Sequence, residues 1–168
     1  RYDPDTTAPS ASPITETFLD STADNGVTVS SPDGNIIFNT VNANEGVGVQ
    51  GGYQNAVTDE GEEIFFAFDS GMYPDGVESV SFNTFYGRGG ATVTVYDVAG
   101  AQLSTFDINN NGGETITIPM QTSAIGSFSI QADSSFFNNN NYFSVQSLTF
   151  TPVITSGVPT SVTHELIE

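Results

Sequence analysis

The sequence predicts an all-β protein, an antiparallel β-sandwich of the jelly-roll type with about 10–11 short strands and little or no helix. Three observations lead to this prediction. Short runs of β-branched and aromatic residues recur along the chain, as they do in strands. Gly, Asn, Asp and Pro separate these runs at close spacing. Several runs alternate apolar with polar residues, which is typical of a strand with one buried and one solvated face.

Each predicted strand is such a run, bounded by turn residues. In order, the strands are 14–19 (ITETFL), 27–31 (VTVSS), 35–39 (NIIFN), 46–50 (GVGVQ), 63–68 (EIFFAF), 78–85 (ESVSFNTF), 91–97 (ATVTVYD), 102–107 (QLSTFD), 114–118 (ETITI), 127–132 (SFSIQA) and 142–151 (YFSVQSLTFT). The run at 78–85 illustrates the alternation, because Val80 and Phe82 point to one face while Ser79 and Ser81 point to the other. A few helical residues are expected at most, at QTSAIG.

One domain accounts for most of the chain, since 168 residues are enough for a single well-packed core. We expect the sandwich to span residues 13–152. Residues 1–12 are polar and Pro-rich and are predicted to form an entry linker. Residues 153–168 are predicted to form an exit linker with the start of a following module. No internal repeat of fixed period is present, and the chain is interpreted as one domain of a longer protein.

The chain is strongly acidic, with a formal net charge of −18, no lysine, and only Arg1 and Arg88 as arginines. Binding to nucleic acid is excluded because it needs a basic surface, and attraction to an anionic membrane is disfavoured for the same reason. No apolar run is long enough to insert into a bilayer. The absence of cysteine excludes a disulfide framework. An acidic, lysine-free chain rich in Asn, Thr, Ser and Gly is typical of secreted bacterial surface proteins. We therefore expect a secreted protein of the bacterial cell surface, where calcium is plentiful.

The order of antiparallel strands predicts which loops meet, because successive connections alternate between the two ends of a sandwich. The end where strand 63–68 begins receives the loops 31–34, 51–62, 86–90, 108–113 and 133–141, which are rich in Gly and Asn. The opposite end receives the loops 69–77, 98–101 and 119–126. Loops on a rigid scaffold commonly carry binding sites. We therefore expect a ligand site at the first of these two ends.

The candidate ligand-binding residues lie in these loops. They are Gly51, Gly52, Tyr53, Gln54, Tyr86, Arg88, Asp133, Asn138, Asn139 and Asn140. Gly and Asn allow left-handed backbone geometry, and Asn amides form hydrogen bonds with sugar hydroxyls or peptide amides. The Asn run is also typical of a plain hairpin loop. Arg88 is expected either to pair with an acid of the chain or to bind a ligand carboxylate in bidentate fashion.

Acidic and amide residues in turns are candidate metal ligands. In TDEGEE (58–63), Asp59 and Glu62 are the first choice, although a charged turn is more often simply solvated. Other turns add Asp33, Asn35, Asp20 and Asp24, which ordinary turn chemistry also explains. Calcium takes about six to eight oxygen ligands from carboxylates, carbonyls and water. Because two arginines cannot balance the acids, we expect one or more bound Ca²⁺ ions.

The sequence gives little support for catalysis. His164 is the only histidine, and cysteine is absent. Ser-His-Asp and Cys-His sites are therefore excluded, as are zinc sites built on several histidines. A carboxylate pair for glycoside hydrolysis is possible in principle, but no pattern places two acids across a cleft. We predict that the protein is not an enzyme.

Several segments together resemble a jelly-roll module of bacterial RTX adhesins. They are GVGVQGG and TDEGEEIFFAFD, then GVESVSFNTF and ATVTVYDVAGAQL, and finally YFSVQSLTFTP. The resemblance covers most of residues 14–150 and is strongest to the calcium-dependent peptide-binding module. It implies a calcium ion that meets the terminal carboxylate of a partner's peptide, with Asp59 and Glu62 in the acidic turn. Gln146 departs from the pattern, which has Asp in the closing strand, so a calcium expected there is absent or built differently.

Three functional hypotheses follow. The first is a calcium-dependent adhesion domain that binds the C-terminal ends of proteins on host or neighbouring cells, as a monomeric module of a longer chain. A calcium ion would solve the electrostatic problem of bringing an anionic peptide end to an acidic domain. The second is a calcium-dependent carbohydrate-binding module of the same fold. The third is a spacer that uses calcium only for rigidity.

Overall fold

The computed structural model describes residues 12–18, 25–39, 46–50, 58–110, 113–134 and 141–154. These residues form ten strands and no helix. The strands are β1 (Ile14–Thr17), β2 (Val27–Ser30), β3 (Ile36–Asn39), β4 (Gly46–Val49), β5 (Glu63–Phe68), β6 (Val77–Asp97), β7 (Gln102–Asn110), β8 (Thr115–Thr117), β9 (Ile125–Ala132) and β10 (Tyr142–Pro152).

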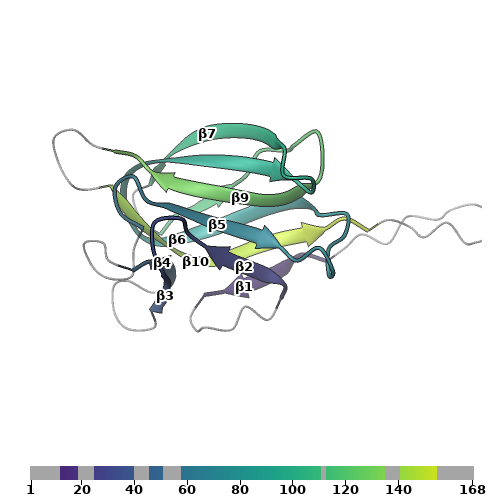
Figure 1. The fold of residues 1–168 in the computed structure, drawn as a ribbon, viewed down its shortest axis with the longest axis horizontal. Helices are drawn as coiled ribbons and strands as arrows, with labels where there is room; N and C mark the ends of the chain where they lie inside the picture. The colour runs from purple at the N-terminus through teal and green to yellow at the C-terminus, as the bar shows by residue number, and fades with distance from the viewer. Residues whose placement is uncertain are drawn as a thin grey trace, which may run out of the picture.

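The strands pack as two layers, which the long strand β6 joins (Figure 1). The front layer runs in the order β2, β5, β9, the second half of β6, and β7. The back layer contains β8, the first half of β6 and β10, with β1 and β4 along the other edge of β10 and β3 outside β4. The predicted all-β antiparallel sandwich is confirmed.

One strand departs from the prediction. The strands expected at 78–85 and 91–97, and the loop expected between them at 86–90, form the single 21-residue strand β6. A straight strand of that length would extend for about 70 Å, yet Val77 and Asp97 at its two ends both lie opposite Ile125 of β9. The strand therefore turns back on itself. Gly89, with a φ of 88°, adopts the left-handed geometry that this bend requires.

The strand register agrees with the predicted sorting of the loops. At one end, which we call the loop end, Glu63 lies opposite Gln131 and Arg88 lies opposite Tyr142. From Ala91 to Asp97 of β6, the paired residues on β9 run backwards from Ala132 to Ile125, so these two segments are antiparallel. At the other end, the exit end, Ile14 lies opposite Phe150. The first and last strands therefore begin and finish side by side, far from the loop end (Figure 1).

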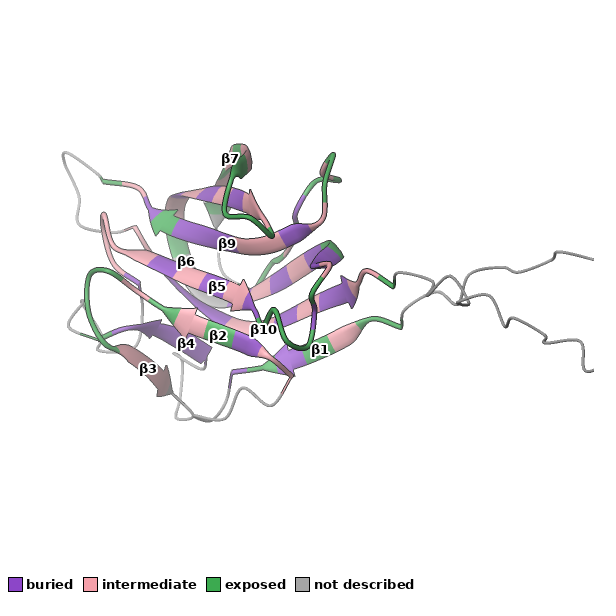
Figure 2. Cartoon of the chain, turned by 45° about the vertical axis from the view of Figure 1, so that its right-hand side comes forward, coloured by how far each residue is buried: buried purple, intermediate pink, exposed green. Residues whose placement is uncertain are grey.

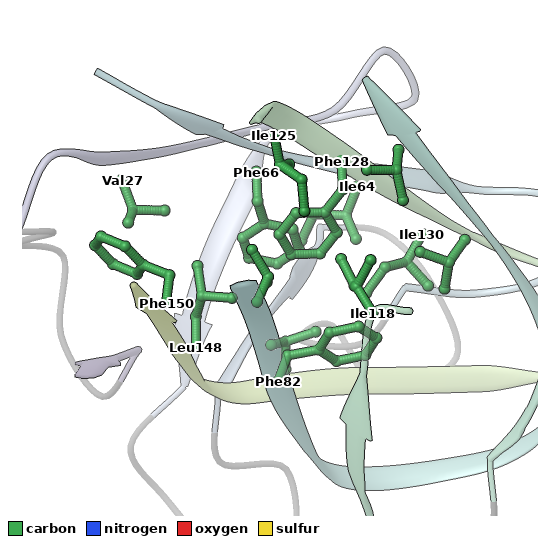
Figure 3. Close-up of a cluster of buried hydrophobic side chains, with 14 of the residues drawn as sticks. Val27, Ile64, Phe66, Phe82, Ile118, Ile125, Phe128, Ile130, Leu148 and Phe150 are labelled. Atoms are coloured by element: carbon green, nitrogen blue, oxygen red, sulfur yellow. The ribbon is translucent and has the colours of Figure 1, made fainter. Parts of the chain in front are cut away.

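The core lies between the two layers. Burial alternates along β5 (Figure 2), as expected for a strand with one face inward. Along β9, Phe128, Ile130 and Ala132 are buried on the same side. Phe66 stacks on Phe128 with ring centroids 5.0 Å apart, and Phe128 stacks on Phe82 of the back layer at 5.7 Å (Figure 3). This aromatic column fixes the front layer against the back layer. Within the described residues, no helix could cross a membrane.

Candidate functional site

The outward side chains of the front layer form an open surface, which we call the outer face. On β5, Phe66 is buried while its neighbour Phe65 is only half-buried, and Val95 and Tyr96 of β6 show the same contrast. Across β5, β9, β6 and β7, three rows make up the outer face: Ala67, Ser127, Tyr96 and Gln102; Phe65, Ser129, Thr94 and Thr105; and Glu63, Gln131, Thr92 and Asp107.

Two aromatic side chains meet above β9 on this face. Phe65 and Tyr96 stand on the strands at either side of β9, so their backbones are about 10 Å apart. Their ring centroids are only 6.5 Å apart, with the planes at 30°. Both rings therefore lean toward each other over β9. The residue beneath them, Ser129, points outward but is 1% exposed, which is explained by this cover.

Hydroxyl and amide groups lie beside the aromatic pair. Gln102 Nε2 donates to Thr105 Oγ1 at 3.0 Å, and Thr105 Oγ1 in turn donates to Thr94 Oγ1 at 3.4 Å. Among the described residues, the Tyr96 hydroxyl has no hydrogen-bond partner of its own. The face thus combines an apolar ring surface with donors and acceptors that can exchange partners with a ligand.

Two carboxylates border the outer face at the loop end. Thr92 Oγ1 lies 3.1 Å from Asp107 Oδ1 and 3.3 Å from Asp133 Oδ1. A hydroxyl has one proton, so it donates to only one of the two at a time. The absence of a side chain at Gly90 makes room for Asp133, whose Oδ2 would collide with a Cβ there. The carboxylates retain the capacity to accept further hydrogen bonds.

The predicted acidic turn also lies at the loop end. Glu62 Oε2 accepts a hydrogen bond from the Asp59 backbone amide at 2.7 Å, and Asp33 Oδ2 accepts one from the Glu63 amide at 2.7 Å. Burial raises the pKa of Glu62, and the negative charges of Asp59 and Asp33 raise it further. The hydrogen bond from Asp59 opposes this shift. The three predicted ligands are thus electrostatic neighbours.

The described residues contain no group of three or more His, Cys, Asp or Glu side chains arranged to hold a metal ion. Asp33, Asp59 and Glu62 share one end of the sandwich but do not converge on one point. Asn35, the other predicted ligand in the 31–35 turn, donates from Nδ2 to Gln50 Oε1 at 3.4 Å.

The remaining loop-end candidates are only partly described. Arg88 is exposed, opposite Tyr142, and it forms no ion pair with any residue that the structure describes. Asn141 donates from Nδ2 to the Asp133 carbonyl at 2.7 Å. Tyr86 lies on β6 at this end, and its side chain is outside the description. The other predicted residues also lie outside the described ones: Gly51, Gly52, Tyr53, Gln54, Asn138, Asn139, Asn140, Asp20 and Asp24.

Sequence reasoning missed the outer-face pair. A local signal was present, because Phe65 and Tyr96 are large aromatics at the outward phase of strands whose inward positions are already apolar. The strand order was not available from the sequence. Only the placement of β9 between β5 and β6 brings the two rings together.

No protein-family model and no curated protein matches the chain. Solved structures with a similar fold are family 29 carbohydrate-binding modules. One lysine-to-alanine mutant is 13% identical, covers 84% of this chain and 89% of its own, and has a TM-score of 0.45. A second such mutant, complexed with cellulohexaose, is 12% identical, covers 86% and 89%, and also scores 0.45. Such distant likenesses leave the function to be argued from the residues themselves.

Proposed function

We propose that this domain is a non-catalytic carbohydrate-binding module whose ligand lies on the outer face. The observation that carries the proposal is the Phe65–Tyr96 pair, half-buried on an open sheet surface beside hydroxyl and amide groups. A sugar ring has an apolar face of C–H groups and a rim of hydroxyls. Aromatic rings pack against the former, while Thr, Gln and Asp side chains exchange hydrogen bonds with the latter.

The charge of the domain favours a neutral ligand. With a formal net charge of −18, the domain repels anions over a range of about 10 Å at moderate ionic strength. The described rows of the outer face carry the acids Glu63 and Asp107 and no basic side chain. Neutral sugars meet no such repulsion, whereas a peptide carboxylate or a uronic acid would need a cation to offset it.

The test is calorimetric titration with neutral β-1,4-linked hexasaccharides of glucose and of mannose, followed by a wider glycan array. Phe65→Ala and Tyr96→Ala should each weaken binding at least tenfold, about 1.4 kcal/mol, because each removes half of the ring surface. Tyr96→Phe keeps the ring and should have a smaller effect. Phe38→Ala is the matched control, since Phe38 is a half-buried aromatic of the back layer and should leave binding unchanged.

Two results would contradict the proposal. One is that no neutral glycan on the array binds to the folded protein. The other is binding that survives both alanine variants but is lost on changes at the loop end. The second result would transfer the ligand site from the outer face to the loops that the sequence singled out.

The loop end supports a second proposal, that calcium binds there. The supporting observation is the mutual repulsion of Asp33, Asp59 and Glu62, which is reflected in the raised pKa of Glu62 and which a divalent cation would relieve. The donors are oxygens, as calcium prefers. Since the described carboxylates form no three-ligand group, backbone carbonyls, water or residues outside the described ranges would complete the coordination.

The adhesin interpretation rests on this second proposal. A calcium-loaded loop end, with Arg88 exposed nearby, could receive the carboxylate of a partner's C-terminal peptide on an extracellular bacterial surface. Titration of a peptide with a free C-terminus, in calcium and again in chelator, tests it. Binding only in calcium, and its loss when the terminus is amidated, is the expected result. Absence of heat in both buffers would remove the peptide proposal and leave the glycan proposal standing.

A further inference from the structure

A small cavity lies next to the aromatic pair at the exit end of the outer face. Its volume is about 270 Å³, below the range of most drug-sized ligand pockets. Ala67 and Ser127, which are opposite each other in the first row of the outer face, form part of its wall. Tyr96 belongs to the same row, and the next residue, Asp97, also lines the cavity. The cavity is therefore continuous with the proposed glycan surface.

Two turns flank this cavity, which is open to solvent on its other side. One turn, which follows β5, contributes Ser70 and Pro74, and the other, between β6 and β7, contributes Val98. The two turns touch next to Ile125, the first residue of β9. Gly76 of the first turn lies so close to Val98 of the second that a Cβ there would be 2.7 Å from Val98 Cγ1 and 2.7 Å from the Ile125 carbonyl oxygen. The two turns therefore bound the cavity on the side that faces away from the aromatic pair.

The side chains that line the cavity are complementary to a single sugar unit, with an apolar floor and polar groups beside it. Phe68 and Tyr73, which are 7% and 9% exposed, provide an apolar floor. Tyr73 donates its hydroxyl proton to the Asn25 carbonyl at 2.7 Å, so only its ring faces a ligand. Ser127 adds a hydroxyl at the mouth. Asp97 uses Oδ1 to accept the Ala99 and Ala101 amides, which holds the carboxylate in place and leaves Oδ2 available.

We propose that this cavity receives the terminal unit of a glycan chain, so that the module binds chain ends rather than chain interiors. The proposal rests on the proposed glycan function of the outer face. The terminal unit occupies the cavity between the two turns with its hydroxyls toward Ser127 and Asp97, and the next units lie across Tyr96 and Phe65. Affinity then depends on the state of one chain end, which binding along an open surface alone would not require.

The experiment compares neutral β-1,4-linked trisaccharides of glucose and mannose with free ends, with a bulky aromatic tag on the reducing end, and with a benzyl ether on the non-reducing end. In the wild-type protein, blocking one end should weaken binding at least tenfold, while blocking the other has little effect. Ala67→Leu, which fills the mouth of the cavity, should weaken binding of the free trisaccharide to the level of the blocked one and leave the blocked one unchanged.

A second variant guards against loss of folding. Asp97→Asn keeps the acceptor that holds the turn but replaces the ligand-facing oxygen, so it should show a smaller loss that is again confined to unblocked ligands. If Phe65→Ala abolishes binding while both blocked ligands bind as well as the free one, the end-binding proposal is wrong and the glycan function stands. If Phe65→Ala changes nothing, the glycan surface itself is wrong, and the end-binding proposal falls with it.

Discussion

The inner and outer faces of the front layer both carry aromatic side chains, but those on the inner face are buried and those on the outer face are only half-buried. On the inner face, Phe66 is 0% exposed and stacks on Phe128 at 5.0 Å and 13°, within a column that reaches the back layer. On the outer face, Phe65 approaches Tyr96 at 6.5 Å and 30° over Ser129, and both rings remain half-buried. Adjacent residues of one strand thus serve two different surfaces.

The two faces differ in what covers their aromatic rings. The inner rings have their contact surface filled by the protein itself, so their contribution is to folding stability. The outer rings contact each other and, being half-buried, leave part of their surface exposed to solvent. This half-buried aromatic pair, beside hydroxyl and amide groups that are hydrogen-bonded to one another, is the feature on which the proposed glycan site rests.

The largest expected difference between the two faces is in the stability lost when Phe66 or Phe65 is replaced by alanine. Phe66→Ala should destabilise the domain by about 3–5 kcal/mol, the usual cost of removing a buried Phe. Phe65→Ala should cost only about 1 kcal/mol, because its ring is half-buried. Urea unfolding monitored by circular dichroism measures both. Equal costs for the two variants would show that Phe65 is a core residue and would remove the reason to assign it to a ligand.

Calcium bound at the loop end should stabilise the domain independently of the core residues on the inner face. Binding to the folded form alone at a concentration 100 times Kd adds about 2.7 kcal/mol, or roughly 5–10 °C in Tm for a chain of this size. Chelation should therefore lower the Tm of the wild-type protein. In Phe66→Ala the calcium-dependent shift should persist, since the two effects are independent. An identical melt in chelator and in millimolar calcium would exclude a folded-state calcium site.

Ser129→Leu tests whether the space beneath the outer rings matters. Ser129 is 1% exposed under Phe65 and Tyr96, so a larger side chain must push the rings apart, at a cost of about 1–3 kcal/mol. Glycan binding should fall because the rings no longer form one surface. Ser81→Leu, at a half-buried position of the back layer, is the control. Unchanged binding in folded Ser129→Leu would mean that the spacing of the rings is irrelevant.

The two faces also explain how far sequence reasoning could reach. Alternation along a run such as 78–85 indicates which residues are buried, because the side-chain period of a strand is two, and it predicted the antiparallel sandwich. The continuity of β6 was missed, because the glycines around Arg88 favour a loop as much as a bent strand. The outer-face pair was missed because it depends on which strands are neighbours, a long-range property that no local pattern contains.

The smallest expected effect is the pH dependence of stability that Glu62 causes at the loop end. Burial, with the charges of Asp59 and Asp33, raises its pKa in the folded state, so the folded protein binds its proton more tightly than the unfolded chain does. The stability that this group contributes is fully present below its unfolded pKa of 4.5 and is lost as pH rises through the higher folded pKa. Glu62→Gln removes this dependence and keeps an oxygen acceptor for the Asp59 amide.

In chelator, the difference in Tm between Glu62→Gln and the wild-type protein should be near zero at pH 4 and should favour the variant by a small amount at pH 7.5. Glu78→Gln, an exposed position at the exit end, controls for the loss of one negative charge. Millimolar calcium should reverse the sign at pH 7.5 if Glu62 is a ligand, because the variant then loses a carboxylate that the ion neutralises. A variant that is less stable than wild type in chelator at pH 7.5 would contradict the raised pKa.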